Sequence, residues 1–115
     1  LDKDVLVIIT GEFGRTPKIN TQIGTQTGVS QPGRDHWPRG FSNIWAGGGI
    51  QTGRCVGATD KRGEDSVERI CGPGDFLATI YHHLGIDWAN TMIKDFNGRP
   101  TRIVESGRPI PELIS

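Results

Sequence analysis

The sequence predicts an α/β fold built on a parallel sheet, and two segments carry this prediction. The run Val5–Ile9 is aliphatic, mostly β-branched and too short to span a membrane. Such a run is typical of a strand that is buried on both faces of a parallel sheet. Residues 75–84 have the apolar spacing of a helix that packs on a sheet. We therefore expect part of a doubly wound sheet with helices on its faces.

The 115-residue chain has too little regular structure for a complete doubly wound domain. It contains 17 glycines and 7 prolines, and its patterns predict one clear helix and a few short strands. It also begins at Leu1, without methionine and close to a core strand. We therefore expect residues 1–115 to be the C-terminal portion of one α/β domain, with the N-terminal half absent from this chain.

The charge composition argues against several classes of protein. Thirteen Lys and Arg residues balance 13 Asp and Glu residues, so no basic surface for nucleic acid or for an anionic membrane is indicated. No apolar run has the length of a membrane span, and neither a signal peptide nor an internal repeat is present. We expect no nucleic-acid partner and no membrane span.

A long polar segment separates the first two expected strands. Residues 18–33 read as a structureless loop, and a loop of this length is typical of a mobile lid over a site. Ionisable and aromatic side chains crowd the next segment, Arg34–Arg39, which we call the polar patch. A second strand is expected at 42–46, and the glycines at 47–49 predict a tight exit where backbone passes close to another segment.

The second half of the chain carries clear local signals. Residues 52–59 predict a short strand and Asp60–Gly63 a turn, so we expect a hairpin-like excursion on the surface. The helix is expected to run from an N-cap at Asp75 to Leu84, with Gly85 in the left-handed C′ position. The tail is expected to hold a helical turn from Asp87, a turn at Asn97–Pro100 between two extended pieces, and an irregular end at 108–111.

Candidate site residues come from the end of the first strand and from the polar patch. Ligands of open α/β sheets bind at the carboxyl ends of strands, where Glu12 and Arg15 lie. Carboxylate and imidazole groups suit divalent ions, so Glu12, Asp35 and His36 are candidate metal ligands. Alternatively, Glu12 pairs with Arg15 or with amides of its own turn, and Asp35 only orients His36.

Three arginines could form a site for an anion. The guanidinium group matches sulfate, phosphate and carboxylate in a bidentate way, which suits Arg15, Arg34 and Arg39. The alternative is that these arginines are scattered in solvent. Trp37 could stack on a sugar or cover the site. Packing of its ring as a wedge between loop and sheet explains it equally well.

The cysteines and the paired histidines predict less. Cys55 and Cys71 are an even pair without Cys-x-x-Cys spacing, which argues against zinc and redox motifs. A disulfide between them is an alternative if the protein is exported. His82 and His83 are neighbours on the expected helix, point in different directions and are expected to be structural.

Several motifs in this chain resemble those of a known family. The motifs are Glu12–Pro17 (Glu-Phe-Gly-Arg-Thr-Pro), Gly33–Pro38 (Gly-Arg-Asp-His-Trp-Pro), Gly57–Asp60 (Gly-Ala-Thr-Asp) and Ala78–Gly85 (Ala-Thr-Ile-Tyr-His-His-Leu-Gly). They recur in similar form in the sulfatase-like family catalogued as domain of unknown function 1501. Their order also resembles the C-terminal part of alkaline-phosphatase-like and sulfatase-like enzymes.

The resemblance implies a doubly wound fold and a hydrolase of sulfate or phosphate esters that uses one or two divalent metals: zinc, calcium, manganese or magnesium. Its nucleophile, a Ser, a Thr or a modified Cys, belongs to the N-terminal half and is not in this chain. The superfamily's Asp-His-Gly corresponds to Glu12-Phe13-Gly14, so Phe13 replaces a ligating His. The later metal-binding or oxyanion-binding His corresponds to His36.

Two functions follow from these residues. The first is a portion of a metal-dependent ester hydrolase, with His36, Arg15 and Arg34 in catalytic roles and Glu12 and Asp35 joining His36 at the metal. The second, favoured by Phe13, is a non-catalytic exported domain that binds an anionic ligand or partner in the same crevice. A small anionic ester or a sulfated glycan is the expected ligand. The missing N-terminal half is the expected protein partner, and the resemblance implies a periplasmic or secreted location.

Overall fold

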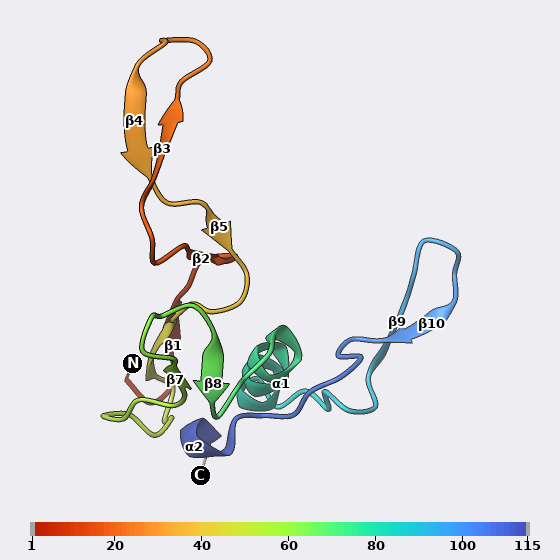
Figure 1. Cartoon of the computed structure of the whole chain (residues 1–115). Coiled ribbons are helices and arrows are strands. Elements are labelled where there is room, and N and C mark those ends of the chain that lie inside the picture. The colour runs from red at the N-terminus through yellow and green to blue at the C-terminus, as the bar shows by residue number, and fades with distance from the viewer. Residues whose placement is uncertain (1, 115) are drawn as a thin grey trace. The chain divides into compact units, whose positions relative to one another are not determined.

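The structure, a computed structural model, describes residues 2–114 (Figure 1). Most of its regular structure consists of short strands joined in pairs. The strands are β1 (Leu6–Ile9), β2 (Gly14–Arg15), β3 (Asn20–Ile23), β4 (Ser30–Gly33), β5 (His36–Trp37), β6 (Ile44–Gly47), β7 (Ala58–Thr59), β8 (Ser66–Glu68), β9 (Met92–Lys94) and β10 (Pro100–Arg102). The helices are α1 (Pro73–His83) and α2 (Pro111–Ile114). Across residues 2–114, neither helix is long and apolar enough to cross a membrane.

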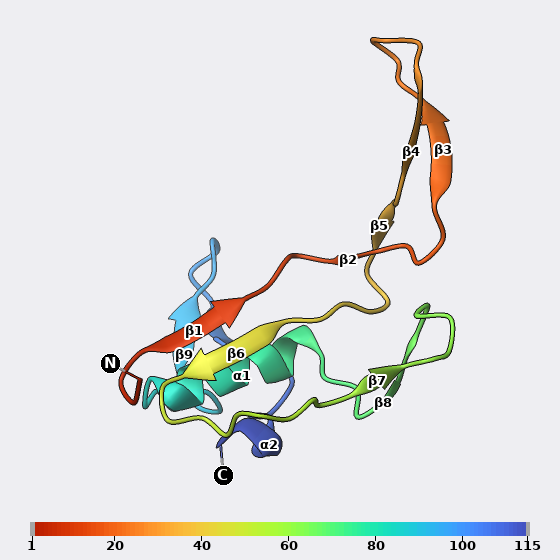
Figure 2. The same cartoon turned by 90° about the vertical axis from the view of Figure 1, so that its left-hand side faces the viewer.

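The predicted doubly wound parallel sheet is wrong. The strands form separate two-stranded sheets, and no strand within residues 2–114 has a neighbour on both edges. The pairs β2–β5, β3–β4, β7–β8 and β9–β10 are antiparallel. The fifth pair is β1 with β6 (Figure 2). The described chain is therefore an assembly of small strand pairs and two helices.

The first strand forms where it was predicted, but its expected burial is wrong. Val5, Val7 and Ile9 are 46%, 51% and 63% exposed. Burial of both faces of a strand requires strands along both edges and layers above and below. Here β1 has only β6 beside it, so every second side chain stays exposed.

The chain divides into two compact units. One contains the segment through Val7, residues Trp45–Val56 and the chain from Cys71 onward; the other contains Ile8–Ile44 and Gly57–Ile70. The polar patch and the predicted turn at Asp60 belong to the second unit, which we call the hairpin unit. The first unit holds both helices, and we call it the helical unit.

The core of the helical unit lies between α1 and the C-terminal segment. Ala78, Val104, Ile110 and Leu113 are the buried apolar residues among those described, and Thr79 is fully buried with them. Three of these residues, Val104, Ile110 and Leu113, come from the C-terminal segment. Residues 108–110 are irregular as predicted, but the chain then continues into α2. The predicted short turn at 87–91 is confirmed, because the Thr91 N–H donates to the Asp87 carbonyl.

Helix α1 is present, but its predicted start and its predicted buried face need correction. It begins at Pro73 after an N-cap at Gly72, and the Asp75 carboxylate accepts a hydrogen bond of 2.8 Å from the Gly72 N–H. Asp75 therefore occupies the third helical position, where an acidic side chain also satisfies a free amide. Leu77 and Leu84 remain exposed, and Phe76 makes an edge contact of 5.0 Å between ring centroids with Trp45 of β6.

The glycine and turn signals of the sequence are confirmed. Gly47, Gly48 and Gly49 all have positive φ angles, and a Cβ at Gly47 would overlap the Val5 carbonyl oxygen. β7 and β8 form a hairpin around the predicted turn at Asp60–Gly63, but β7 covers only Ala58–Thr59, so the strand expected around residues 54–57 is not formed. The turn at Asn97–Pro100 connects β9 and β10 as predicted.

Residues 18–33 are not a structureless lid. They contain the β3–β4 hairpin, whose register runs from Asn20 opposite Gly33 to Ile23 opposite Ser30 (Figure 1). A hydrogen bond of 3.0 Å from the Gly24 N–H to the Val29 carbonyl closes its loop. The side chains here are mostly polar and exposed, so backbone pairing forms the hairpin and leaves little apolar alternation in the sequence.

Candidate functional site

The β2–β5 pair brings the end of the first strand to the polar patch. Arg15 lies directly opposite His36, and Gly14 lies opposite Trp37. Two hydrogen bonds of 3.0 Å join the next two residues, Thr16 and Asp35. The Thr16 N–H donates to the Asp35 carbonyl, and the Asp35 N–H donates to the Thr16 hydroxyl. Two segments that are far apart in the sequence thus form one short ladder.

Phe13 occupies the face of His36. Their ring centroids are 3.9 Å apart and their planes are tilted by 32°. The guanidinium carbon of Arg15 lies 5.7 Å from the Phe13 ring centroid, within the range of a cation–π contact. Phe13 is therefore a packing platform for both His36 and Arg15.

Arg15 and Arg34 are both exposed and lie next to each other. Arg15 Nη1 donates a hydrogen bond of 3.1 Å to the Arg34 carbonyl. Within residues 2–114, neither guanidinium has an ion pair, and that of Arg34 has no hydrogen-bond partner. We call Phe13, Arg15, Arg34 and His36 the Arg15–His36 cluster.

The Asp35 carboxylate accepts hydrogen bonds from side chains of the β3–β4 hairpin. Its Oδ1 accepts a hydrogen bond of 3.0 Å from Gln22, and its Oδ2 accepts one of 3.5 Å from Asn20. A shallow hollow of about 340 Å³ lies on this face of the hairpin, lined by polar side chains and by Arg34 and Asp35. Among residues 2–114, no hydrogen bond or ion pair joins the Asp35 carboxylate to the His36 ring.

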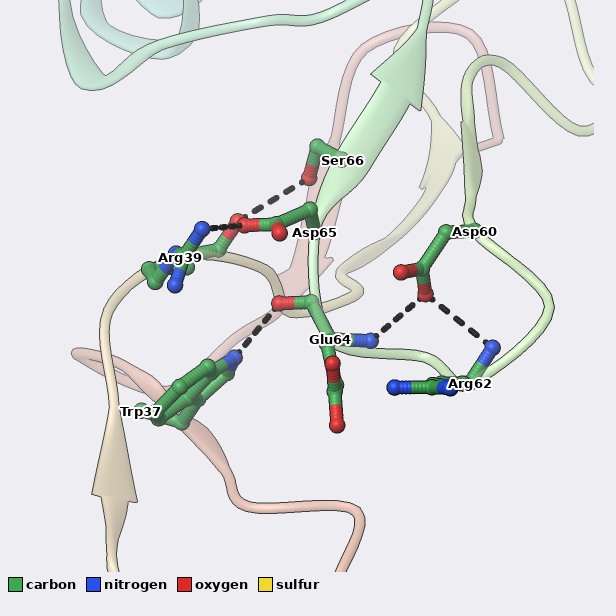
Figure 3. A network of polar contacts seen from close by, with 7 residues as sticks. All are labelled: Trp37, Arg39, Asp60, Arg62, Glu64, Asp65 and Ser66. Atoms are coloured by element: carbon green, nitrogen blue, oxygen red, sulfur yellow. Dashed lines mark hydrogen bonds and ion pairs between the residues drawn. The ribbon is translucent and has the colours of Figure 1, made fainter.

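Trp37 and Arg39 are held by the chain before β8 (Figure 3). Trp37 Nε1 donates a hydrogen bond of 2.6 Å to the Glu64 carbonyl, and Arg39 Nη2 forms an ion pair of 2.5 Å with Asp65. The Ser66 hydroxyl donates to the Arg39 carbonyl. Arg39 is therefore engaged by a carboxylate, and half-buried Trp37 acts as a wedge. The β7–β8 hairpin is a structural partner of the patch and not only a surface excursion.

Asp60 shapes the turn that presents Glu64 and Asp65 (Figure 3). Its Oδ1 accepts hydrogen bonds of 2.8 Å from the Glu64 N–H and 3.1 Å from the Arg62 N–H. These bonds lower the pKa of the Asp60 carboxyl below its ordinary value of 3.8. The sequence indicated the turn through Asp60 and Gly63, but it gave no signal for the partners of Trp37 and Arg39.

Acid should weaken this turn through Asp60. Because the pKa of Asp60 is lower in the folded chain than in the unfolded chain, its contribution to stability is present above pH 3.8 and is lost as the pH falls through the lowered value. We expect Asp60→Asn to lose this part of the acid dependence of the urea midpoint, measured from about pH 6 to pH 2. Asp4→Asn is the control, because no hydrogen bond to its carboxylate occurs in the described structure. Identical pH profiles for both variants would contradict the assignment.

The predicted metal ligands do not form a metal centre on their own. Glu12 is exposed, and no residue in 2–114 pairs with its carboxylate, so the alternative of an ion pair with Arg15 is not realised. Both oxygens of Asp35 are engaged by side-chain amides. Among residues 2–114, no group of three or more His, Cys, Asp and Glu side chains is placed to hold a metal ion.

The comparisons with known proteins identify one family. No curated protein and no solved structure matches the chain. A family profile matches residues 1–114, which is nearly the whole chain, and it is described as Protein of unknown function (DUF1501). This match confirms the resemblance to domain of unknown function 1501 that the motifs indicated. The chain therefore belongs to the family described as Protein of unknown function (DUF1501).

Proposed function

We propose that the chain binds an anionic group of the sulfate, phosphate or carboxylate class at the Arg15–His36 cluster. The observation that carries this proposal is the register of β2 and β5, which sets Arg15 directly opposite His36. Side chains of directly opposed residues lie on the same face of a strand pair, with Cβ atoms about 5 Å apart. One oxyanion can therefore contact both side chains.

The contacts around Arg15 support the same function. Its bond to the Arg34 carbonyl holds the Arg15 guanidinium beside the Arg34 backbone, and stacking of Phe13 on His36 limits the motion of the imidazole. Guanidinium donors match the oxygens of sulfate, phosphate and carboxylate in paired hydrogen bonds. Because these side chains are exposed, we expect weak binding that falls as salt concentration rises.

Calorimetric titration with sodium sulfate at low ionic strength tests the proposal. We expect Arg15→Gln to weaken binding about tenfold, or roughly 1.4 kcal/mol, since one guanidinium contact is lost. Arg102→Gln on β10 is the matched control, because Arg102 is also exposed and lies in the helical unit. Equal losses in both variants would show that sulfate responds only to net charge, and would overturn the assigned site.

A metal-dependent hydrolase of sulfate or phosphate esters is the second candidate function. It is favoured by the exposed carboxylate of Glu12, which directly precedes Phe13 of the cluster. In this function Glu12, Asp35 and His36 would supply part of the ligand set for zinc, calcium, manganese or magnesium, because among residues 2–114 they do not form a complete metal-binding group, and Arg15 and Arg34 would bind the ester anion. The substrate is then a small anionic ester or a sulfated glycan, and the protein is periplasmic or secreted, as in the sulfatase-like enzymes that the motifs resemble. Metal-dependent turnover of a nitrophenyl sulfate or phosphate that His36→Ala abolishes would favour this function over simple binding.

A further inference from the structure

We propose that Cys55 and Cys71 form a reversible disulfide that closes the base of the β7–β8 hairpin. The two thiols are the only cysteines in the sequence, and both are exposed. Their separation in the sequence gives no reason to pair them, but the register of the hairpin does.

The register of β7 and β8 leads directly to the two cysteines. Ala58 lies opposite Glu68 in this antiparallel pair. Cys55 lies three residues before Ala58, and Cys71 lies three residues after Glu68. The irregularity in the pair lies between Ala58 and Thr59, on the far side from the cysteines, so it does not change this count. Counted outward, the same register sets Cys55 opposite Cys71, although the strand ladder itself ends at Ala58 and Glu68, where the next residues, Gly57 and Arg69, have left-handed φ angles of +87° and +45°.

The two segments remain close beyond the last residues of the strands. At Gly57, φ is +87°, and a Cβ there would lie 3.1 Å from the Arg69 carbonyl oxygen and 3.2 Å from that of Glu68. The segment before β7 thus still touches the segment after β8 at Gly57. Opposed residues in antiparallel pairs have Cα atoms about 4.5 to 5.5 Å apart, a span that a disulfide bridges without distortion.

A disulfide between Cys55 and Cys71 would enclose the loop that holds two residues of the polar patch. The chain between the cysteines contains Glu64 and Asp65, which hold Trp37 and Arg39. On the other side, Cys71 is followed by Gly72, whose N–H is bound by the Asp75 carboxylate of α1. A bond between the cysteines restricts the unfolded states of the enclosed loop and so favours its ordered form.

The reaction is a thiol–disulfide exchange with a small disulfide such as oxidised glutathione. One protein thiolate attacks a glutathione sulfur, which forms a mixed disulfide and releases one glutathione thiolate. The second protein thiolate then attacks the protein sulfur of that mixed disulfide and releases the second glutathione. The two protein thiols lose two electrons and two protons in total, and oxidised glutathione is reduced to two thiols.

Peptide mass spectrometry of the full chain tests this pairing. The chain is equilibrated in a glutathione redox buffer, alkylated, and digested with trypsin without reductant. Cleavage after Arg54 and Arg69 leaves the cysteines on separate peptides, 55–61 and 70–94. We expect these peptides to be linked, with a mass about 2 Da below the sum of the two reduced peptides. We also expect at least a tenfold larger equilibrium constant for their pairing in the folded chain than in concentrated urea.

Other outcomes of the same experiment would overturn the inference. Both cysteines could be recovered in alkylated form at glutathione ratios that oxidise ordinary dithiols, or only pairs of like cysteines from two chains could be found. Equal pairing in folded and urea-unfolded chains would also contradict it, since the hairpin register would then contribute nothing. Cys55→Ser and Cys71→Ser are the controls, and each must remove the 55–61 to 70–94 linkage.

Discussion

Alanine at position 74 is expected to lower the free energy of unfolding of the helical unit by about 3 kcal/mol, because it forces two backbone segments apart. A Cβ on Gly74 would overlap the Ser106 carbonyl oxygen and lie 2.8 Å from its carbonyl carbon. The contact is tight from both sides, since a Cβ on Gly107 would lie 2.6 Å from the Asp75 nitrogen. Neither partner can move aside as a flexible side chain would.

Urea unfolding followed by circular dichroism measures this effect, and the same helix offers a matched control. At Gly72, two residues earlier, φ is −97° and a Cβ would lie 3.9 Å from the Asp75 carboxylate, an ordinary contact. We therefore expect Gly72→Ala to cost less than about 1 kcal/mol. Similar losses for Gly72→Ala and Gly74→Ala would contradict the close packing of α1 against the C-terminal segment.

Replacement of Thr79 by valine should have the second largest effect. Thr79 is fully buried, and its hydroxyl accepts a hydrogen bond of 2.9 Å from the Ile110 N–H and donates one of 2.7 Å to the Asp75 carbonyl. Valine has nearly the same shape but leaves the buried Ile110 N–H without an acceptor. An unsatisfied buried donor costs about 2 kcal/mol, which we expect to appear in the same urea experiment.

Two controls separate this hydrogen bond from simple packing. Thr79→Ser keeps the hydroxyl and removes a methyl group, so we expect it to cost about 1 kcal/mol. Thr101→Val on β10 loses only a weak bond of 3.5 Å to the Arg99 carbonyl and should be close to neutral. A Thr79→Val variant that is as stable as the wild type would show that Ile110 finds another acceptor.

Local signals in the sequence predicted local structure well. The turn at Asp60–Gly63, the turn at Asn97–Pro100 and the glycine exit at 47–49 are present, because the side chains that determine them lie inside the turns themselves. Pairing partners were not predictable in this way. The run Val5–Ile9 indicates a strand, but nothing within the run says that β6 is its neighbour or that one face stays exposed.

The same limit applies to the candidate site. The sequence identified the end of the first strand and the polar patch as sources of candidate site residues. Their contact, however, depends on the register of β2 and β5. The partners of Trp37 and Arg39 were missed, since Glu64 contributes a backbone carbonyl that any residue carries. The β3–β4 hairpin was missed because its polar residues pair through the backbone and bury almost no apolar surface.

The most direct test of anion binding is an NMR titration with sodium sulfate against sodium chloride of equal ionic strength. The proposal predicts that side-chain resonances of Arg15 and His36, and the ring of Phe13, shift along one saturable curve that chloride does not reproduce. Resonances of Arg102 should stay unchanged. Shifts of equal size at all exposed arginines, or no sulfate-specific shift at Arg15 and His36, would contradict the proposed site.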